Sequence, residues 1–194
     1  MSTAMNTKDI VHIALFAALT AALGVFPPVT LPVIGVPITA QSMGAMLAGS
    51  ILGARRGALA LVLFLVLVAA GLPLLAGGRG GFAVFLGPSA GFLFAWPLTA
   101  FVTGWLFERY WARLTFLHAV SFLAFAGIVV LYPIGILWIA AVAGAPLATV
   151  AASSAAFIPG DVVKIVLTAV VALAVKRSYP LIPGIRGREL AGTP

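Results

Sequence analysis

Six long apolar runs, separated by short stretches rich in polar residues, glycine or proline, dominate the hydrophobic pattern of the chain. They fall at residues 10–26, 39–54, 57–76, 84–107, 117–143 and 157–175. A transmembrane helix needs about 20 mostly apolar residues, so each run is interpreted as one such helix. The second run is short, and Pro133 inside the fifth predicts a kink. The pattern therefore predicts an all-α integral membrane protein, a single domain over residues 1–194 with six transmembrane helices in a compact bundle.

The composition agrees with a membrane location. Only 8% of the residues are charged and 63% are hydrophobic, with a mean hydropathy of +1.22, whereas about 25% of residues are charged in soluble domains. No cleavage-site pattern follows the first run, which we expect to be a retained helix. Cysteine is absent, which excludes disulfides and thiol catalysis. His12 and His118 are too far apart in the sequence to predict a metal site.

The basic residues predict the orientation in the membrane. Nine of the eleven flank helix ends that share one side if both termini are cytoplasmic: Lys8, Arg55, Arg56, Arg109, Arg113, Lys176, Arg177, Arg186 and Arg188. This is the pattern expected of cytoplasmic loops. It also accounts for the net charge of +7 without a nucleic-acid partner, since no basic stripe with interleaved aromatic residues is present.

Three charged residues remain on the outer side: Arg79, Asp161 and Lys164. Asp161, Lys164 and Thr168 are spaced i, i+3 and i+7, which puts them on one face of the sixth helix. Such a polar stripe must face the protein interior or a wet cavity. It is either an internal ion pair that fixes the helix or one wall of a small-molecule pocket. Asp161 also follows a Pro-Gly pair at the expected helix start, where the helix dipole favours a carboxylate.

Two outer connections lie close to this stripe in the predicted topology. The first, residues 26–41, contains four prolines and almost no charge, and we expect it to fold over the outer face as a lid. Gln41 follows it at the start of the second helix. The second contains "GGRGG", in which four glycines surround Arg79. It lacks the Lys and Ser/Thr of a phosphate-binding P-loop.

The sequence "GPSAG" at residues 87–91 matches the G-x-S-x-G pattern of serine hydrolases. That elbow needs a strand–turn–helix context, and no histidine follows Asp161 to complete the usual chain order. A simpler interpretation is a small-residue face that lets another helix pack closely. The face repeats every four residues: Gly87, Gly91, Ala95, Thr99 and Thr103.

The first helix has a similar stripe of small residues, Ala14, Ala18 and Ala22. Small residues let helix backbones approach closely inside a membrane. The stripe can serve packing within the bundle or docking of another membrane protein, and composition does not choose between them.

Three segments together resemble one family. They are "PITAQSMGAMLAG" in the second helix, "GGRGGFAVFLGPSAGFLFAWP" before and in the fourth, and "PGDVVKIVLTA" in the sixth. In this order and spacing the chain resembles the BioY family, the biotin-specific substrate-binding (S) components of energy-coupling factor (ECF) transporters. Where that family often shows "GPTGG", this chain has "GPSAG".

The resemblance implies that the chain binds biotin as a transported ligand, not as a cofactor, and that it is not an enzyme. It implies that Asp161 accepts a ureido N–H, that Lys164 donates to a ligand oxygen, and that Arg79 meets the carboxylate. Weaker candidates for ligand contact are Gln41, Gly87 and Ser89.

The resemblance also implies a bacterial cytoplasmic membrane and a set of partner subunits. The stripe of Ala14, Ala18 and Ala22 would contact a transmembrane coupling subunit, which two cytoplasmic ATPase subunits energise. The chain has no Walker motif of its own. An S component for thiamine or riboflavin and a stand-alone biotin carrier remain the alternatives, and a homo-oligomer is left open.

Overall fold

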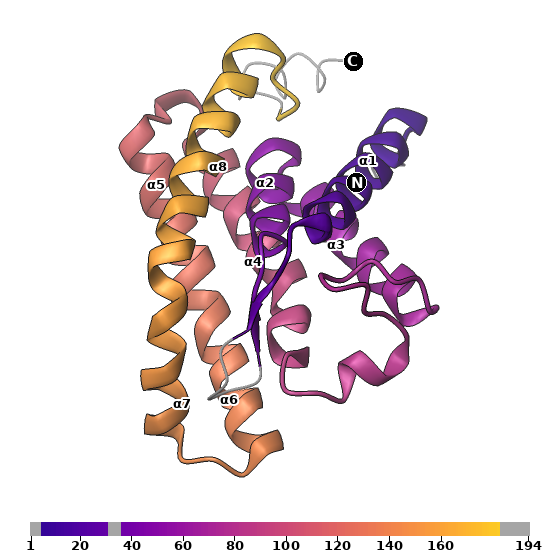
Figure 1. The fold of residues 1–194 in the computed structure, drawn as a ribbon. Coiled ribbons are helices and arrows are strands. Elements are labelled where there is room, and N and C mark those ends of the chain that lie inside the picture. Colours follow the sequence, from indigo (N-terminus) through magenta and orange to yellow (C-terminus); the bar gives the residue numbers. More distant parts are fainter. Residues whose placement is uncertain (1–4, 31–35, 183–194) are drawn as a thin grey trace.

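The computed structural model describes residues 5–30 and 36–182, which form a bundle of helices with one short hairpin (Figure 1). The helices are α1 (Thr7–Ala22), α2 (Ser42–Leu52), α3 (Ala54–Ala69), α4 (Ala90–Tyr110), α5 (Phe116–Ala124), α6 (Leu131–Ala143), α7 (Leu147–Ser154) and α8 (Ile158–Ser178). The strands are β1 (Val29–Thr30) and β2 (Pro37–Ile38). The helical class predicted from the apolar runs is confirmed.

Four helical segments are long and apolar enough to cross a membrane: Thr7–Val25, Ala90–Arg113, Phe116–Ala143 and Leu147–Ser178. The second and third predicted spans are shorter than expected. α2 has 11 residues and α3 has 16, which at 1.5 Å per residue correspond to about 16 and 24 Å. Gly53 separates them with a φ of 87°, a backbone conformation that glycine adopts readily.

The short helix α2 forms the centre of the bundle. Nine of its eleven residues are buried, and it packs against α1, α3, α4 and α8. Close approach depends on glycines, since a Cβ added to Gly49 would meet the backbone carbonyl of Ala100 on α4. The small-residue face predicted on α4 is confirmed from Gly91 to Thr103, where every member is buried. Gly87 precedes the helix and is not part of that face.

Replacing Gly49 with alanine is expected to lower the unfolding temperature of the purified protein. The added methyl would force α2 and α4 apart, and overpacking of this kind costs about 1–3 kcal/mol. The measurement is thermal unfolding in detergent without ligand. Gly87→Ala is the control, because the Cβ it adds would lie 3.8 Å from its nearest neighbour, the Val84 carbonyl oxygen. Equal unfolding temperatures for the two variants would contradict the close packing.

The last two predicted spans form a long antiparallel pair on one side of the bundle (Figure 1). α5 continues into α6 through a π-helical turn, Phe125–Val130, immediately before the expected kink site at Pro133. The wider turn accommodates a residue that cannot donate to the helical ladder. The sixth helix begins earlier than predicted, since α7 continues into α8 through a 3₁₀ turn, Ala155–Phe157.

The first outer connection contains a hairpin that the sequence did not predict. Val29 pairs with Ile38 in antiparallel register, and no helix interrupts the described residues from 26 to 41. Residues 31–35 of the expected lid lie outside the described part of the chain. In the second connection, Gly77 and Gly78 both have positive φ, and this tight turn brings Leu75 and Arg79 into an isolated β-bridge.

The basic helix ends gather at one end of the bundle. Arg56 bonds to Asp9 at 3.1 Å and to the carbonyl of Leu181 at 2.7 Å. These contacts join the start of α1, the start of α3 and the segment after α8. Lys176 similarly donates to the carbonyl of Trp111 at 2.7 Å. Helix ends that the charge pattern placed on one side of a membrane therefore meet in the folded protein.

Candidate functional site

Asp161 and Lys164 form an ion pair near the middle of the bundle. Lys164 Nζ donates to Asp161 Oδ1 at 2.7 Å and to Ser42 Oγ at 3.0 Å. Tyr132 donates its hydroxyl proton to the second carboxylate oxygen, Oδ2, at 2.7 Å. Only 7% of Asp161 is exposed, and its carboxylate is held by two donors from different helices.

Three helices position this cluster. Asp161 and Lys164 are one turn apart on α8, Tyr132 lies in the first turn of α6, and Ser42 is the first residue of α2. The helix dipole is not the main support of Asp161, because helical backbone continues upstream through α7. Direct hydrogen bonds from Tyr132 and Lys164 stabilise the carboxylate instead.

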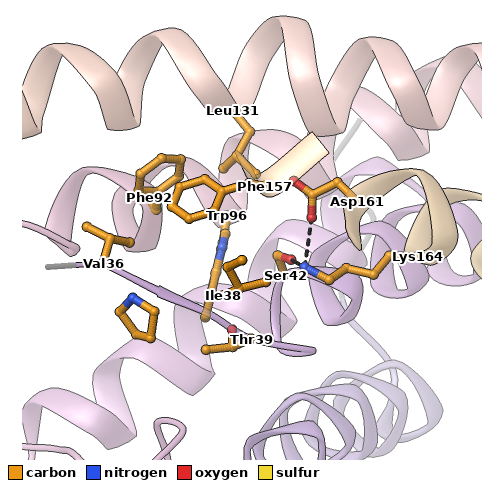
Figure 2. Close-up of a pocket in the computed structure, with 11 residues that line it drawn as sticks. Val36, Ile38, Thr39, Ser42, Phe92, Trp96, Leu131, Phe157, Asp161 and Lys164 are labelled. Carbon is orange, nitrogen blue, oxygen red and sulfur yellow. Dashed lines mark hydrogen bonds and ion pairs between the residues drawn. The ribbon is translucent and has the colours of Figure 1, made fainter. Parts of the chain in front are cut away.

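A small cavity of about 60 Å³ opens beside the ion pair (Figure 2). The pair and Ser42 form its polar side. The rest of the lining is almost entirely apolar or aromatic: Val36, Pro37, Ile38, Thr39, Phe92, Trp96, Leu131 and Phe157. Phe92 meets Phe157 edge to face, with ring centroids 6.0 Å apart. Strand β2 supplies one wall, so the unpredicted hairpin forms part of the site.

A second cavity of about 40 Å³ lies next to the first. The two share five lining residues, Val36, Pro37, Thr39, Phe92 and Trp96. Arg79, Gln41 and Ser89 line the second cavity. Known ligand pockets enclose about 300–1,000 Å³, so a ligand that occupied both cavities would have to enlarge them by moving some of the side chains that line them.

The other predicted polar and backbone candidates do not all line the two cavities. Thr168 is fully buried but lines neither of these two cavities. The carbonyl of Gly87 accepts a hydrogen bond from Trp138 Nε1 at 3.0 Å, and Gly87 lines neither cavity either. Ser89 precedes α4 after a 3₁₀ turn and not after a strand, so the strand–turn–helix elbow of serine hydrolases is not formed there.

Gln41 has a structural role in addition to its place beside the second cavity. It is 1% exposed, and its Nε2 donates to the carbonyls of Thr20 at 3.1 Å and Leu74 at 2.8 Å. Its Oε1 accepts from the backbone N–H of Ala76 at 2.8 Å. One side chain thereby joins α1, α2 and the connection after α3.

Sequence reasoning did not identify Tyr132, Ser42 or Trp96 as site residues. Ser42 directly follows Gln41, which is the nearest available signal for it. A tyrosine within an apolar run needs a hydrogen-bond partner when its hydroxyl is buried, and this is the signal that could have found Tyr132. Nothing in the local sequence indicates which partner it meets.

Removing the Tyr132 hydroxyl is expected to weaken ligand binding modestly. Tyr132→Phe leaves Asp161 Oδ2 without its donor while the ring can keep its edge-to-face contacts with Phe92 and Phe157. Loss of a hydrogen bond to a charged group costs about 1.5–3 kcal/mol, divided between stability and binding. Titration calorimetry and thermal unfolding would measure the two shares. Tyr110→Phe, outside both cavities, is the control, and wild-type behaviour of Tyr132→Phe in both assays would contradict this role.

The alanine stripe of α1 faces outward. Ala14, Ala18 and Ala22 are all exposed, whereas Ala17 on the adjacent face is buried. Large apolar side chains beside the stripe are exposed as well, among them Leu15 and Leu19. The stripe therefore does not serve packing within the described bundle.

Comparisons with known proteins agree on one family. A profile of the BioY family matches residues 1–181. A protein named biotin transporter BioY from Rhizobium etli is 53% identical over 184 residues, 92% of this chain and 98% of that protein. Its counterpart from Rhodobacter capsulatus is 48% identical over 182 residues, 89% and 95% of the two chains. The fold is similar to the crystal structure of an S-component for biotin from an ECF-type ABC transporter, with a TM-score of 0.87, 33% identity, and coverage of 92% of this chain and 97% of that one.

Proposed function

The chain belongs to the BioY family, and from this premise we propose that the cavities beside Asp161 and Lys164 are its biotin pocket. The protein is a membrane protein that functions in biotin uptake, and it is not an enzyme. The observation that carries the pocket proposal is the ion pair itself. Two charged side chains lie beside an apolar, aromatic cavity, where ionisable groups are costly and usually functional.

The chemistry of the two cavities fits the two ends of biotin. Asp161 is an acceptor suited to a ureido N–H, and the ammonium of Lys164 has three protons, two of which are directed at Asp161 and Ser42. The third can be donated to a ligand oxygen. Arg79 lines the neighbouring cavity and is proposed to meet the carboxylate of the tail. Ser89 and Gln41, in the same lining, are weaker candidates, as is Gly87, which lies outside that lining.

The aromatic walls between the two polar ends suit the apolar bicycle and tail. Phe92 and Trp96 line both cavities. Ligand pockets are usually lined by apolar and aromatic side chains with a few placed polar groups. The proposed pocket therefore has a donor–acceptor pair at one end, an aromatic middle and a cationic group at the other end.

The charge pattern and the exposed stripe support a proposal for the orientation and the partners. We place the chain in the bacterial cytoplasmic membrane with both termini cytoplasmic, since the contacts of Arg56 join basic helix ends at one end of the bundle. In this orientation all six predicted segments cross, with α2 and α3 as the two short ones. A transmembrane coupling subunit would dock on Ala14, Ala18 and Ala22, and two cytoplasmic ATPase subunits would supply energy.

A binding titration of the purified protein with biotin, thiamine and riboflavin tests the proposal. We expect saturable binding of biotin alone, because the thiazolium cation of thiamine would lie near the cationic Lys164 and Arg79, and the tricyclic ring of riboflavin is larger than the bicycle of biotin and would have to enlarge these small cavities further. Binding of thiamine or riboflavin without biotin binding would overturn the assignment.

A further inference from the structure

Trp96 has a buried indole N–H without an acceptor among the described residues. Only 5% of the residue is exposed, and its Nε1 makes no hydrogen bond within residues 5–30 and 36–182. Trp138 differs, since its Nε1 donates to the carbonyl of Gly87. Trp105, on the same helix as Trp96, is 49% exposed. Trp96 is therefore distinct from both of these tryptophans in its polar environment.

A buried donor without a partner is costly, at about 1–3 kcal/mol. Buried tryptophan N–H groups usually find an acceptor, and an unpaired one in a native protein calls for an explanation such as a ligand or a water molecule. Trp96 lines both cavities of the proposed pocket, so the missing acceptor can be supplied from within the pocket.

The indole is held in place by its neighbours. Its ring packs against Phe64 on α3 with centroids 6.0 Å apart, and Figure 2 shows it between the aromatic pair Phe92 and Phe157 on one side and Thr39 on the other. A donor on a rigid, well-packed ring loses little conformational entropy when a ligand binds.

We infer that the Nε1–H of Trp96 donates a hydrogen bond to the ureido oxygen of bound biotin, which makes Trp96 a specificity-determining residue of the pocket. This inference rests on the proposed function. Trp96 and the Asp161–Lys164 pair line the same cavity. A carbonyl oxygen has two lone pairs, so it can accept from Trp96 and from Lys164 together while Asp161 accepts a ureido N–H.

The test compares two ligands on two proteins. Trp96→Phe removes the N–H and is expected to lower biotin affinity about tenfold, as for one lost hydrogen bond in a buried site. Protonated iminobiotin carries a donor where biotin has the ureido oxygen. Its affinity is therefore expected to be nearly the same for wild type and variant. Trp105→Phe is the matched control on the same helix and should bind both ligands as wild type does.

Three results would overturn the inference: wild-type biotin affinity in Trp96→Phe, equal losses for biotin and iminobiotin, or biotin affinity that stays at the wild-type value when 3-benzothienylalanine replaces Trp96. The last substitution keeps the bicyclic ring and removes only the N–H, so it decides the case if Trp96→Phe fails to fold. Failure of the wild-type protein to bind biotin would instead contradict the proposed function, which separates the two outcomes.

Discussion

Asp161→Asn is expected to lower biotin affinity by at least tenfold. The substitution removes the charge that faces Lys164 at 2.7 Å, and it replaces the charged acceptor proposed for a ureido N–H with a neutral amide. Hydrogen bonds to charged groups contribute about 1.5–3 kcal/mol, and each 1.4 kcal/mol is about a factor of ten in the dissociation constant. Titration calorimetry on the purified protein measures the change, with Asp9→Asn as the control, since it removes the ion pair to Arg56 at the end of the bundle where the basic helix ends gather.

A double variant, Asp161→Asn with Lys164→Met, separates the pocket from a purely internal ion pair. Breaking one partner of a buried pair leaves an uncompensated charge, whereas removing both is often nearly neutral for stability. If the pair served only to fix α8, the double variant would recover both the unfolding temperature and biotin binding. We expect it to recover stability but to bind biotin weakly, because the lysine donor and the charge of the acceptor are both gone.

Replacing the alanines of the α1 stripe with bulky side chains is expected to remove most of the biotin uptake while leaving biotin binding unchanged. Ala14, Ala18 and Ala22 are exposed, and small residues permit the close helix contacts that drive association in membranes. Replacing all three with tryptophan would keep a partner helix at a distance without disturbing a buried contact of the bundle. Uptake of labelled biotin by cells that contain the complete transporter measures the effect, with calorimetry on the purified variant for binding.

The matched control is Val170→Trp, an equally bulky change at an exposed position of α8. It should leave both uptake and binding unchanged. Wild-type uptake by the triple variant would contradict docking on the stripe. Uptake by the wild-type protein in cells that lack the ATPase subunits tests the alternative of a stand-alone biotin carrier. Undiminished uptake in those cells would favour a carrier over a coupled transporter.

The sequence predicted the positions of the helices that coincide with long apolar runs. The apolar runs located each helix that crosses the bundle, because a segment in lipid must satisfy its backbone hydrogen bonds internally. The start of the sixth helix was predicted ten residues too late. The residues from 147 to 156 are mostly small or polar, and Pro159 with Gly160 marked an apparent start. Proline is tolerated in the first turn of α8, so the helical backbone continues across it.

The residues of the candidate site also differ in whether the local sequence could predict them. The spacing of Asp161 and Lys164 is local, and the i, i+3 rule brings their side chains together in any helix. Tyr132 and Ser42 join them from α6 and α2, and Trp96 faces the cavity from α4. These contacts depend on how the neighbouring helices pack around α2. That packing cannot be read from any one segment of the sequence.

The sequence by itself determined that the protein lies in a membrane, that most of its basic residues flank the predicted helices, and that α8 carries one acid–lysine pair. Each of these follows from hydropathy, loop charge or helical periodicity, which are properties of short segments. The tertiary structure alone decided which side chains pair with Asp161 and Lys164, that β2 and Trp96 line the cavity, and that Gln41 joins α1 to the connection after α3. Those contacts join residues as many as 122 positions apart, and they arise because glycine-mediated packing around α2 brings distant helices together.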